Sequence, residues 1–351
     1  MQSFPNFWKK LNLISLLLFP LSIIFLLIII LRRKYIKAEK LIRPAKIIVV
    51  GNITVGGNGK TPTIISLCEK LSQEGKKIAV ISRGYGGENN QQKNQEVIEI
   101  SENSSAEIVG DEAILMRNKL AHLGIKIAVA RKRIKAANYL LNKYPDIEII
   151  ISDDGLQHYY LPRDFELILI APDLLFGNNL LLPAGPLREP KSRINQAQAI
   201  ATFQDAKISG LKPEIKQFHL TTNIGNLYRL TDNKSIKKEE LDGKKIILIS
   251  SIARPERILN SVEKLQIELN KTLFFPDHEN LSSDKNLETI SNATNNFDCI
   301  ILTEKDAVKT DKWQEELRQK TLVIPYTIII PDELLKLINQ TLYPRKYQQG
   351  D

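Results

Sequence analysis

Residues 51–63 read GNITVGGNGKTPT, and this glycine-rich stretch decides the fold. An apolar run at 47–50 precedes it, and a helix-compatible segment follows at 63–71. Strand, glycine-rich loop and helix in this order are typical of a phosphate-binding loop, because backbone N–H groups and a helix N-terminus then point at a polyphosphate. The stretch therefore predicts an α/β fold of the P-loop NTPase type that binds a nucleoside triphosphate.

The last residues of this loop predict how the triphosphate and its cation are held. Lys60 is expected to reach the β- and γ-phosphates, and the Thr61 hydroxyl is expected to bind Mg²⁺. The residues expected to surround the phosphates are Thr54, Val55, Gly56, Gly57, Asn58, Gly59, Lys60 and Thr61. Thr54 departs from the pattern G-x-x-x-x-G-K-[ST], which begins with glycine. A chance glycine-rich turn before a helix is the alternative interpretation.

Size and composition narrow the class of protein. A length of 351 residues indicates about two domains, and 43% hydrophobic residues support a substantial core. Cys68 and Cys299 lie far apart in apolar segments, so neither a disulfide framework nor a cysteine-based metal site is predicted. The net charge of +9 comes partly from one local cluster, and no stripe of interleaved basic and aromatic residues indicates nucleic-acid binding.

Residues 11–31, LNLISLLLFPLSIIFLLIIIL, form an almost wholly apolar segment. As a helix it is roughly 30 Å long, which matches the hydrocarbon core of a bilayer. The basic residues that follow it are Arg32, Arg33, Lys34, Lys37, Lys40 and Arg43, so the larger C-terminal part is expected in the cytoplasm. The segment predicts a membrane anchor, as a spanning helix or as a monotopic helix in one leaflet. Its length argues against a cleaved signal peptide.

Short β-type runs alternate with amphipathic stretches after the anchor, which predicts a parallel sheet flanked by helices. The expected strands are 46–50, 77–82, 125–130, 147–152, 166–171 and 199–203, with helices at 112–123 and 132–143. The alternation restarts at 244–250 and predicts a second, smaller α/β domain, with strands at 273–275, 299–303 and 322–325 and helices at 256–265 and 331–342. The expected domain limits are 1–40 for the N-terminal membrane helix and its basic collar, 41–215 for the P-loop core, 216–230 for a two-stranded linker and 231–351 for the C-terminal lobe.

Asp153 and Asp154 are candidates for binding Mg²⁺. They close the apolar strand expected at 147–152, and a nucleotide-bound cation is held at this end of core strands in open α/β sheets. A helix N-cap or a turn is the structural alternative for either aspartate. Because Gly155, Gln157 and His158 follow the pair, we expect a functional role for the group.

Two further positions offer a proton acceptor. Asp111 and Glu112 begin an expected helix, where they either complement the helix dipole or act as a metal-linked acid or as a base toward a hydroxyl. His278 follows Asp277 at an expected strand end, where it is a proton acceptor or a structural histidine. Nearby, residues 303–306 (TEKD) end another strand and are candidates for contacting the base or ribose of the nucleotide.

Two loops carry residues suited to phosphate chemistry. The turn at 82–87 (SRGYGG) either presents Arg83 and Tyr85 to a phosphorylated substrate or is only flexible. The proline-rich loop at 182–190 (LPAGPLREP) contains Arg188, which would stabilise a transferring phosphate, and Glu189, which would lie near the metal.

Taken in order, these segments resemble one family closely. They are an apolar anchor, GNITVGGNGKTP, SRGYGG, VGDE, DDGLQH, LPAGPLREP, PDH and TEKDAVK. The chain is similar to the tetraacyldisaccharide 4′-kinases, the lipid A kinases of Gram-negative bacteria, from about residue 11 to about residue 309. The family's loop also begins with Thr or Ser, so Thr54 fits it. Departures are Leu156 in place of a frequent Phe, and Glu279 after His278.

The resemblance implies ATP-dependent phosphorylation of the 4′-hydroxyl of an acylated, 1-phosphorylated glucosamine disaccharide, which yields lipid IVA. It implies ATP and Mg²⁺ as cofactors, and the lipid disaccharide and membrane lipid as binding partners. It places the protein at the bacterial inner membrane, with its catalytic domains on the cytoplasmic side. Neither nucleic acid nor an obligate protein partner is expected, and a monomer is sufficient.

The resemblance also implies roles for individual residues. Asp111 is the implied catalytic base, assisted by His278 from the second lobe, with Lys60 and Arg188 completing the catalytic set. The implied metal ligands are Thr61, Asp153, Asp154, Glu189 and Glu112, and the implied substrate contacts are Arg83, Tyr85, Gln157 and His158. Arg131 and Arg133 are alternatives for one further substrate contact.

A membrane-tethered P-loop ATPase or GTPase that acts on protein partners is the alternative function. Val55 stands where some such ATPases carry an additional lysine, which weakens this alternative. The segment 303–306 differs at its first residue from the guanine-recognition pattern Asn-Lys-x-Asp. A small-metabolite kinase with an added anchor is a third hypothesis. Release of ADP that requires the acylated acceptor distinguishes the lipid kinase from both.

Overall fold

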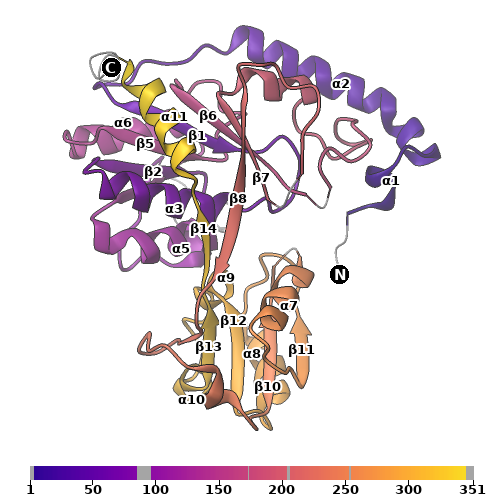
Figure 1. Cartoon of the computed structure of the whole chain (residues 1–351), viewed down its shortest axis with the longest axis vertical. Coiled ribbons are helices and arrows are strands. Elements are labelled where there is room, and N and C mark those ends of the chain that lie inside the picture. The colour runs from indigo at the N-terminus through magenta and orange to yellow at the C-terminus, as the bar shows by residue number, and fades with distance from the viewer. Residues whose placement is uncertain (1–3, 85–95, 173, 204–205, 253, 345–351) are drawn as a thin grey trace.

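Two β-sheets organise the chain in its computed structural model, which describes residues 4–84, 96–172, 174–203, 206–252 and 254–344. One sheet has nine strands and the other has five. Figure 1 shows the nine-stranded sheet and its helices above the five-stranded sheet, with a long pair of strands running between them. We call the two parts the large lobe and the small lobe.

The sheet of the large lobe is mostly parallel, as the sequence predicts. Its strand order is β14-β8-β7-β6-β1-β5-β2-β4-β3, and only the pairs β14–β8 and β4–β3 are antiparallel. The strands are β1 (Lys46–Gly51), β2 (Ile78–Ser82), β3 (Ile98–Glu99), β4 (Lys126–Val129), β5 (Ile149–Asp153), β6 (Phe165–Ile170), β7 (Ala199–Phe203), β8 (Lys216–Ile224) and β14 (Tyr326–Ile329). The strand β1 lies at the centre, between β5 and β6, so the loop that follows it opens at the middle of the sheet.

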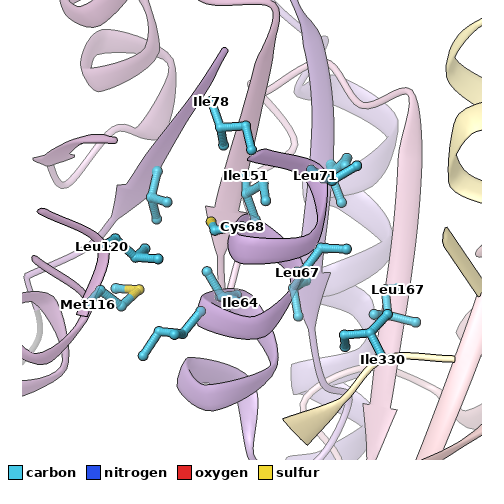
Figure 2. Packing of buried hydrophobic residues seen from close by; sticks show 14 of the residues in the cluster. Ile64, Leu67, Cys68, Leu71, Ile78, Met116, Leu120, Ile151, Leu167 and Ile330 are labelled. Carbon is cyan, nitrogen blue, oxygen red and sulfur yellow. The ribbon is translucent and has the colours of Figure 1, made fainter. Parts of the chain in front are cut away.

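Helices cover both faces of this sheet, which is why its central strands are continuous apolar runs. The helices are α3 (Lys60–Gln73), α4 (Ala106–Val109), α5 (Asp111–Leu120), α6 (Arg133–Lys143) and α11 (Asp332–Leu342), with the 3₁₀ turns η1 (Ala121–Leu123) and η2 (Lys191–Gln196). Ile48 and Val50 of β1 pack into the core shared with α3, α5 and α11, whereas Ile47 and Val49 pack into the core shared with α6. Figure 2 shows one face of α3 turned toward the first of these cores.

The small lobe is a second α/β unit with its own cores. Its strand order is β11-β10-β12-β13-β9, and only β9 is antiparallel to its neighbour. The strands are β9 (Tyr228–Arg229), β10 (Ile246–Ser250), β11 (Lys271–Phe274), β12 (Cys299–Thr303) and β13 (Thr321–Ile324). The helices are α7 (Pro255–Lys264), α8 (Asp284–Thr294), α9 (Glu304–Ala307) and α10 (Glu315–Gln319), with the 3₁₀ turn η3 (Lys238–Leu241).

The last two described elements, β14 and α11, belong to the large lobe. Strand β14 pairs with β8, and Leu334, Ile338 and Leu342 of α11 are buried in the core beside α3. Strand β8 itself, within the linker expected at 216–230, is a strand of the large sheet. We therefore propose a large lobe of residues 41–224 and 326–344 and a small lobe of 225–325, in place of 41–215 and 231–351.

The apolar N-terminal segment forms α2 (Leu13–Tyr35), after the short α1 (Asn6–Lys9). Within the described residues it is the one helix long and apolar enough to cross a membrane, judged by length and composition. Its buried residues, Ser15, Ser22 and Ile29, repeat every seven positions and form a narrow stripe against the large lobe. The Ser22 hydroxyl donates to the Leu181 carbonyl oxygen at 2.7 Å and accepts from the Ala184 N–H at 3.1 Å. Most other apolar side chains of α2 are exposed.

Candidate active site

The glycine-rich loop joins β1 to α3, as expected for a phosphate-binding loop. Gly59 has a φ of +72° and precedes the first residue of α3, and among the residues that the structure describes no side chain caps this helix N-terminus. Its first N–H groups are therefore suited to bind an anion. Thr54 is buried, and its hydroxyl accepts a hydrogen bond from the Asn58 amide at 3.0 Å. The hydroxyl thus stabilises the loop from inside.

Lys60 lies beside a network of charged and polar groups behind the loop. Its ammonium donates to the Asn52 side-chain oxygen at 3.2 Å and lies 3.9 Å from Asp154 Oδ1. The two terminal nitrogens of Arg188, Nη1 and Nη2, each donate a hydrogen bond to one carboxylate oxygen of Asp154, at 2.8 Å in both cases. Burial acts to raise the pKa of the Asp154 carboxyl, but Lys60 and Arg188 together hold this pKa well below its usual range. Asp154 is therefore an ionised residue with positively charged partners.

Asp153 differs from Asp154 in its surroundings. The Ser82 hydroxyl donates to its Oδ2 at 2.9 Å, whereas its Oδ1 is buried and has no hydrogen-bond partner among the described residues. Burial, with Glu112 nearby, raises the pKa of Asp153 to about 6. A buried carboxylate oxygen without a partner, at the carboxyl end of β5, fits a Mg²⁺ ion because Mg²⁺ prefers oxygen ligands. Within the described residues, no group of three or more His, Cys, Asp and Glu side chains could hold a metal alone.

The segments 153–158 and 188–190 meet next to this pair of aspartates. The Gln157 amide donates to the Arg188 carbonyl oxygen at 3.0 Å and to Glu189 Oε1 at 3.2 Å, and the Tyr159 hydroxyl donates to the same oxygen at 2.6 Å. Glu189 is fully buried, and its Oε2 has no partner among the described residues. Burial and the nearby Arg133 lower the pKa of His158 to about 3, so this imidazole is neutral at physiological pH.

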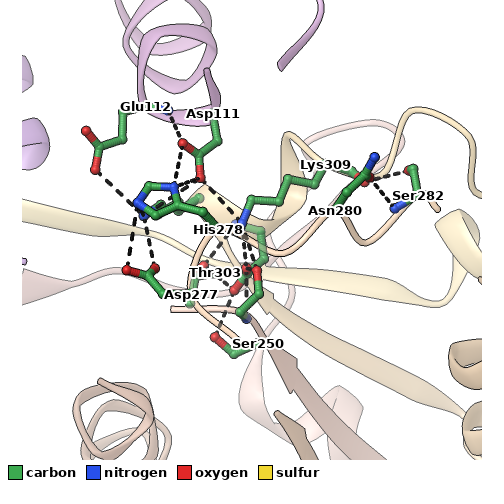
Figure 3. A network of polar contacts seen from close by, with 12 residues as sticks. Asp111, Glu112, Ser250, Asp277, His278, Asn280, Ser282, Thr303 and Lys309 are labelled. Carbon is green, nitrogen blue, oxygen red and sulfur yellow. Dashed lines mark hydrogen bonds and ion pairs between the residues drawn. The ribbon is translucent and has the colours of Figure 1, made fainter. Parts of the chain in front are cut away.

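The small lobe contributes His278 to a site on the large lobe (Figure 3). Asp111 begins α5, directly after Gly110 with its φ of +90°. His278 Nδ1 lies 3.1 Å from Asp111 Oδ2 and 3.2 Å from its Oδ1. Burial would raise the pKa of Asp111, but His278, Lys305 and Lys309 hold it well below its usual range. The hydrogen bond with Asp111 raises the pKa of His278.

The expected site residues lie in two groups. Lys60, Asp153, Asp154, Gln157, Arg188 and Glu189 lie around the loop between β1 and α3, and Asp111 and His278 meet where the two lobes make contact. Glu112 lies 3.7 Å from Lys305 of the small lobe. Arg83 is exposed, and Tyr85 lies outside the described residues. Arg133 is buried and donates to the Ala130 and Asp153 carbonyl oxygens, whereas Arg131 is exposed.

Sequence reasoning missed several residues of the site. Asn52 accepts hydrogen bonds from Lys60 and Arg188, and Tyr159 holds Glu189. The segment 303–306 stays a predicted contact of the base or ribose. Its Lys305 lies 3.7 Å from Asp111 Oδ2, and its Asp306 is fully buried and bonded inside the small lobe. The position of Asn52, directly after the central strand, is the one signal in the sequence that could have indicated its role.

Comparison with known proteins identifies the family. The model of the family described as tetraacyldisaccharide-1-P 4′-kinase matches residues 14–343. The chain belongs to this family. A tetraacyldisaccharide 4′-kinase of Dichelobacter nodosus is 38% identical over 342 residues, which cover 96% of this chain and 97% of that protein. One from Actinobacillus pleuropneumoniae serotype 7 is 36% identical over 315 residues, with 87% and 89% covered.

A solved structure agrees with this membership in the tetraacyldisaccharide 4′-kinase family. The crystal structure of LpxK from Aquifex aeolicus in complex with ATP covers 94% of this chain and 100% of its own. The TM-score is 0.74 and the sequence identity is 26%. This member of the kinase family therefore shares its fold, a large mostly parallel sheet flanked by helices, with a solved relative.

Proposed function

We propose that this protein transfers the γ-phosphate of ATP to the 4′-hydroxyl of a tetraacyldisaccharide 1-phosphate, which forms lipid IVA in lipid A biosynthesis. Family membership and the similarity to LpxK support this activity. The observation that carries the proposal is the pairing of Asp111 with His278 across the two lobes, on the same molecule as a phosphate-binding loop backed by Lys60 and Asp154.

The large lobe would hold the nucleotide. Lys60 and the N-terminus of α3 would bind its phosphates, and Arg188, held in place by Asp154, would balance the charge that develops during transfer. Thr61 and Asp153 would hold Mg²⁺, with Glu189 and Glu112 as further candidates. Bound Mg²⁺ supplies charge neutralisation on the phosphate oxygens. Two observations support these assignments. Asp153 Oδ1 has no partner among the described residues, and the Arg188 guanidinium is held in one orientation by Asp154.

Asp111 would accept the proton of the acceptor hydroxyl, and His278 would orient its carboxylate. Both groups are ionisable, lie within hydrogen-bond distance of each other and come from different lobes. The meeting of the lobes would therefore assemble the base and exclude water at the same time. Arg83, Tyr85, Gln157 and His158 remain predicted contacts of the acceptor sugar or its phosphate.

The membrane anchor would bring the site to its lipid acceptor. Helix α2 exposes a large apolar surface, and its last turn carries Arg32, Arg33 and Lys34. Basic residues of this kind interact with anionic headgroups by about 1 kcal/mol each near the surface. We propose that α2 anchors the protein in the inner membrane with both lobes in the cytoplasm, as a monomer.

A mass-spectrometric assay with ATP and the lipid disaccharide tests the function. The expected product is heavier than the acceptor by one phosphate, and ADP is released only when the acceptor is present. Replacing Asp111 with Ala is expected to lower turnover by about 10²–10⁴-fold, the usual contribution of general base catalysis. Release of ADP at the same rate without the lipid acceptor would favour the ATPase switch instead.

A further inference from the structure

Lys309 is a buried cation to which the roles above assign no task. Its side chain is 6% exposed, and its Nζ lies 3.4 Å from Asp111 Oδ2. Lysine is almost never buried to this degree without a charged or polar partner. Asp111 belongs to the large lobe and Lys309 to the small lobe, so this contact joins the two (Figure 3).

The small lobe holds the Lys309 ammonium in place with its own residues. Asp306 is fully buried, and its carboxylate accepts hydrogen bonds from the Ser250, Ser251 and Thr303 hydroxyls at 2.8, 2.6 and 2.7 Å and from the Ser251 N–H at 3.0 Å. Lys309 Nζ donates to the Ser251 hydroxyl at 2.7 Å and lies 3.7 Å from Asp306 Oδ1. Because these partners all belong to the small lobe, the ammonium is fixed independently of Asp111.

Lys305, the other lysine beside Asp111, is held differently. Its side chain is 20% exposed, and its Nζ lies 3.5–3.7 Å from the carboxylates of Asp111, Glu112 and Asp277. Its charge is therefore shared among three acids. The Lys309 ammonium contacts one carboxylate of the large lobe within the described part of the chain, and that carboxylate is Asp111. Lys309 thus pairs with one acid of each lobe, Asp306 within the small lobe and Asp111 of the large lobe.

We propose that Lys309 is a positioning residue for phosphoryl transfer, an inference that rests on the proposed kinase function. An ammonium group has three donors. One of them is donated to the Ser251 hydroxyl, and the ammonium forms ion pairs with Asp306 Oδ1 at 3.7 Å and, when the lobes meet, with Asp111 Oδ2 at 3.4 Å. Asp111 then has one carboxylate orientation relative to His278. The segment TEKDAVK, at 303–309, therefore positions Asp111, the proposed catalytic base, through its two lysines.

Substitution of Lys309 tests this role, with Lys312 as the matched control. Lys312 also pairs across the lobes, with Glu107 at 3.0 Å, but at the exposed rim, where ion pairs contribute little. For K309M, kcat for the lipid acceptor is expected to fall by about 100-fold, the cost of a misplaced reacting group, while KM for ATP changes by less than about threefold. K309R is expected to recover at least about a tenth of the activity, and K312M to remain within about twofold of the wild type.

A double-mutant cycle shows whether Lys309 acts through Asp111. In the D111N background, K309M is expected to lower kcat by no more than about twofold, because the group that Lys309 positions is already lost. Losses that multiply, or a K309M kcat within about twofold of the wild type, would overturn the proposal. Binding of a non-hydrolysable ATP analogue and the thermal midpoint report whether K309M is folded.

If K309M does not fold, Ser251→Ala keeps the ammonium and removes its 2.7 Å acceptor. A kcat equal to that of the wild type in S251A would then contradict the proposal. The activity of the wild-type protein separates the proposed kinase function from the proposed role of Lys309. Absence of lipid phosphorylation by the wild type removes both, whereas wild-type activity matched by K309M removes only the role of Lys309.

Discussion

Arg188 and Asp154 form a two-pronged ion pair in which Nη1 lies 2.8 Å from Oδ2 and Nη2 lies 2.8 Å from Oδ1. Both carboxylate oxygens of Asp154 are therefore occupied by a guanidinium. Bidentate pairs of this kind are among the stronger charge-assisted hydrogen bonds. Asp153, its neighbour, keeps one buried oxygen without a partner among the described residues. The two aspartates, which the sequence could not separate, are thus suited to different tasks.

This difference predicts separate responses to Mg²⁺. Asp153→Asn is expected to raise the Mg²⁺ concentration for half-maximal activity by at least about tenfold, because a metal ligand is lost. Asp154→Asn is expected to lower kcat through Arg188 while the Mg²⁺ requirement stays within about threefold. Mn²⁺ binding followed by electron paramagnetic resonance gives a readout independent of turnover. A weaker Mn²⁺ affinity in the Asp154 variant alone would reverse the assignment.

The left-handed conformation of Gly59 predicts a specific cost of substitution. A Cβ at this position would lie 2.7 Å from Phe203 Cζ, and the φ of +72° is strained for alanine by about 1–2 kcal/mol. Gly59→Ala is expected to lower the thermal midpoint by roughly 2–4 °C for each kcal/mol lost. Gly57→Ala is the control, because a Cβ there would meet nothing within 4 Å. Equal midpoints for the two variants would contradict this account.

His158 predicts how stability depends on pH. Burial and Arg133 lower its folded-state pKa to about 3, whereas the unfolded value is about 6.5. Between these values the unfolded chain binds more protons, so this residue makes stability fall as the pH falls from about 6.5 toward about 3. His158→Gln is expected to lose less stability than the wild type between pH 7 and pH 4.5, measured by thermal or urea unfolding. A parallel loss in both proteins would contradict the buried, neutral imidazole.

The central part of the fold could be predicted because local signals and burial agree there. The strands of the large lobe from β1 to β7, apart from the two-residue β3, are mostly apolar, and most of them are followed by turn residues and an amphipathic helix. The strand β14 was missed because it follows β13 after a single residue, and it pairs with β8, about a hundred residues away. Pairing at such a distance leaves no periodic signal in the sequence. The domain limits expected at 216–230 and 231–351 depended on this missing pairing.

In the candidate site, sequence motifs indicate which residues belong to the site, but they do not indicate the contacts and the role of each residue. The sequence placed Asp111 and His278 together only through the family resemblance, since 167 residues separate them. Asn52 and Tyr159 act through hydrogen bonds to other site residues, so their chemistry alone gives no sign of function. Lys309 lies within the motif TEKDAVK, but its contact with Asp111 depends on how the two lobes meet.

The stripe of α2 that contacts the large lobe has a consequence for which hydroxyl can react. Leu181 and Ala184, which bind Ser22, belong to the same loop that carries Arg188, and Arg32 at the other end of the helix donates to the Gln157 carbonyl oxygen at 3.5 Å. If α2 lies in the membrane, these contacts hold the large lobe directly against it. The distance between the lipid headgroups and the reaction centre is then fixed, because no flexible linker joins the two. The acyl chains of the acceptor stay in the same leaflet. Only a hydroxyl that lies at this fixed distance from the membrane surface can then reach the reaction centre.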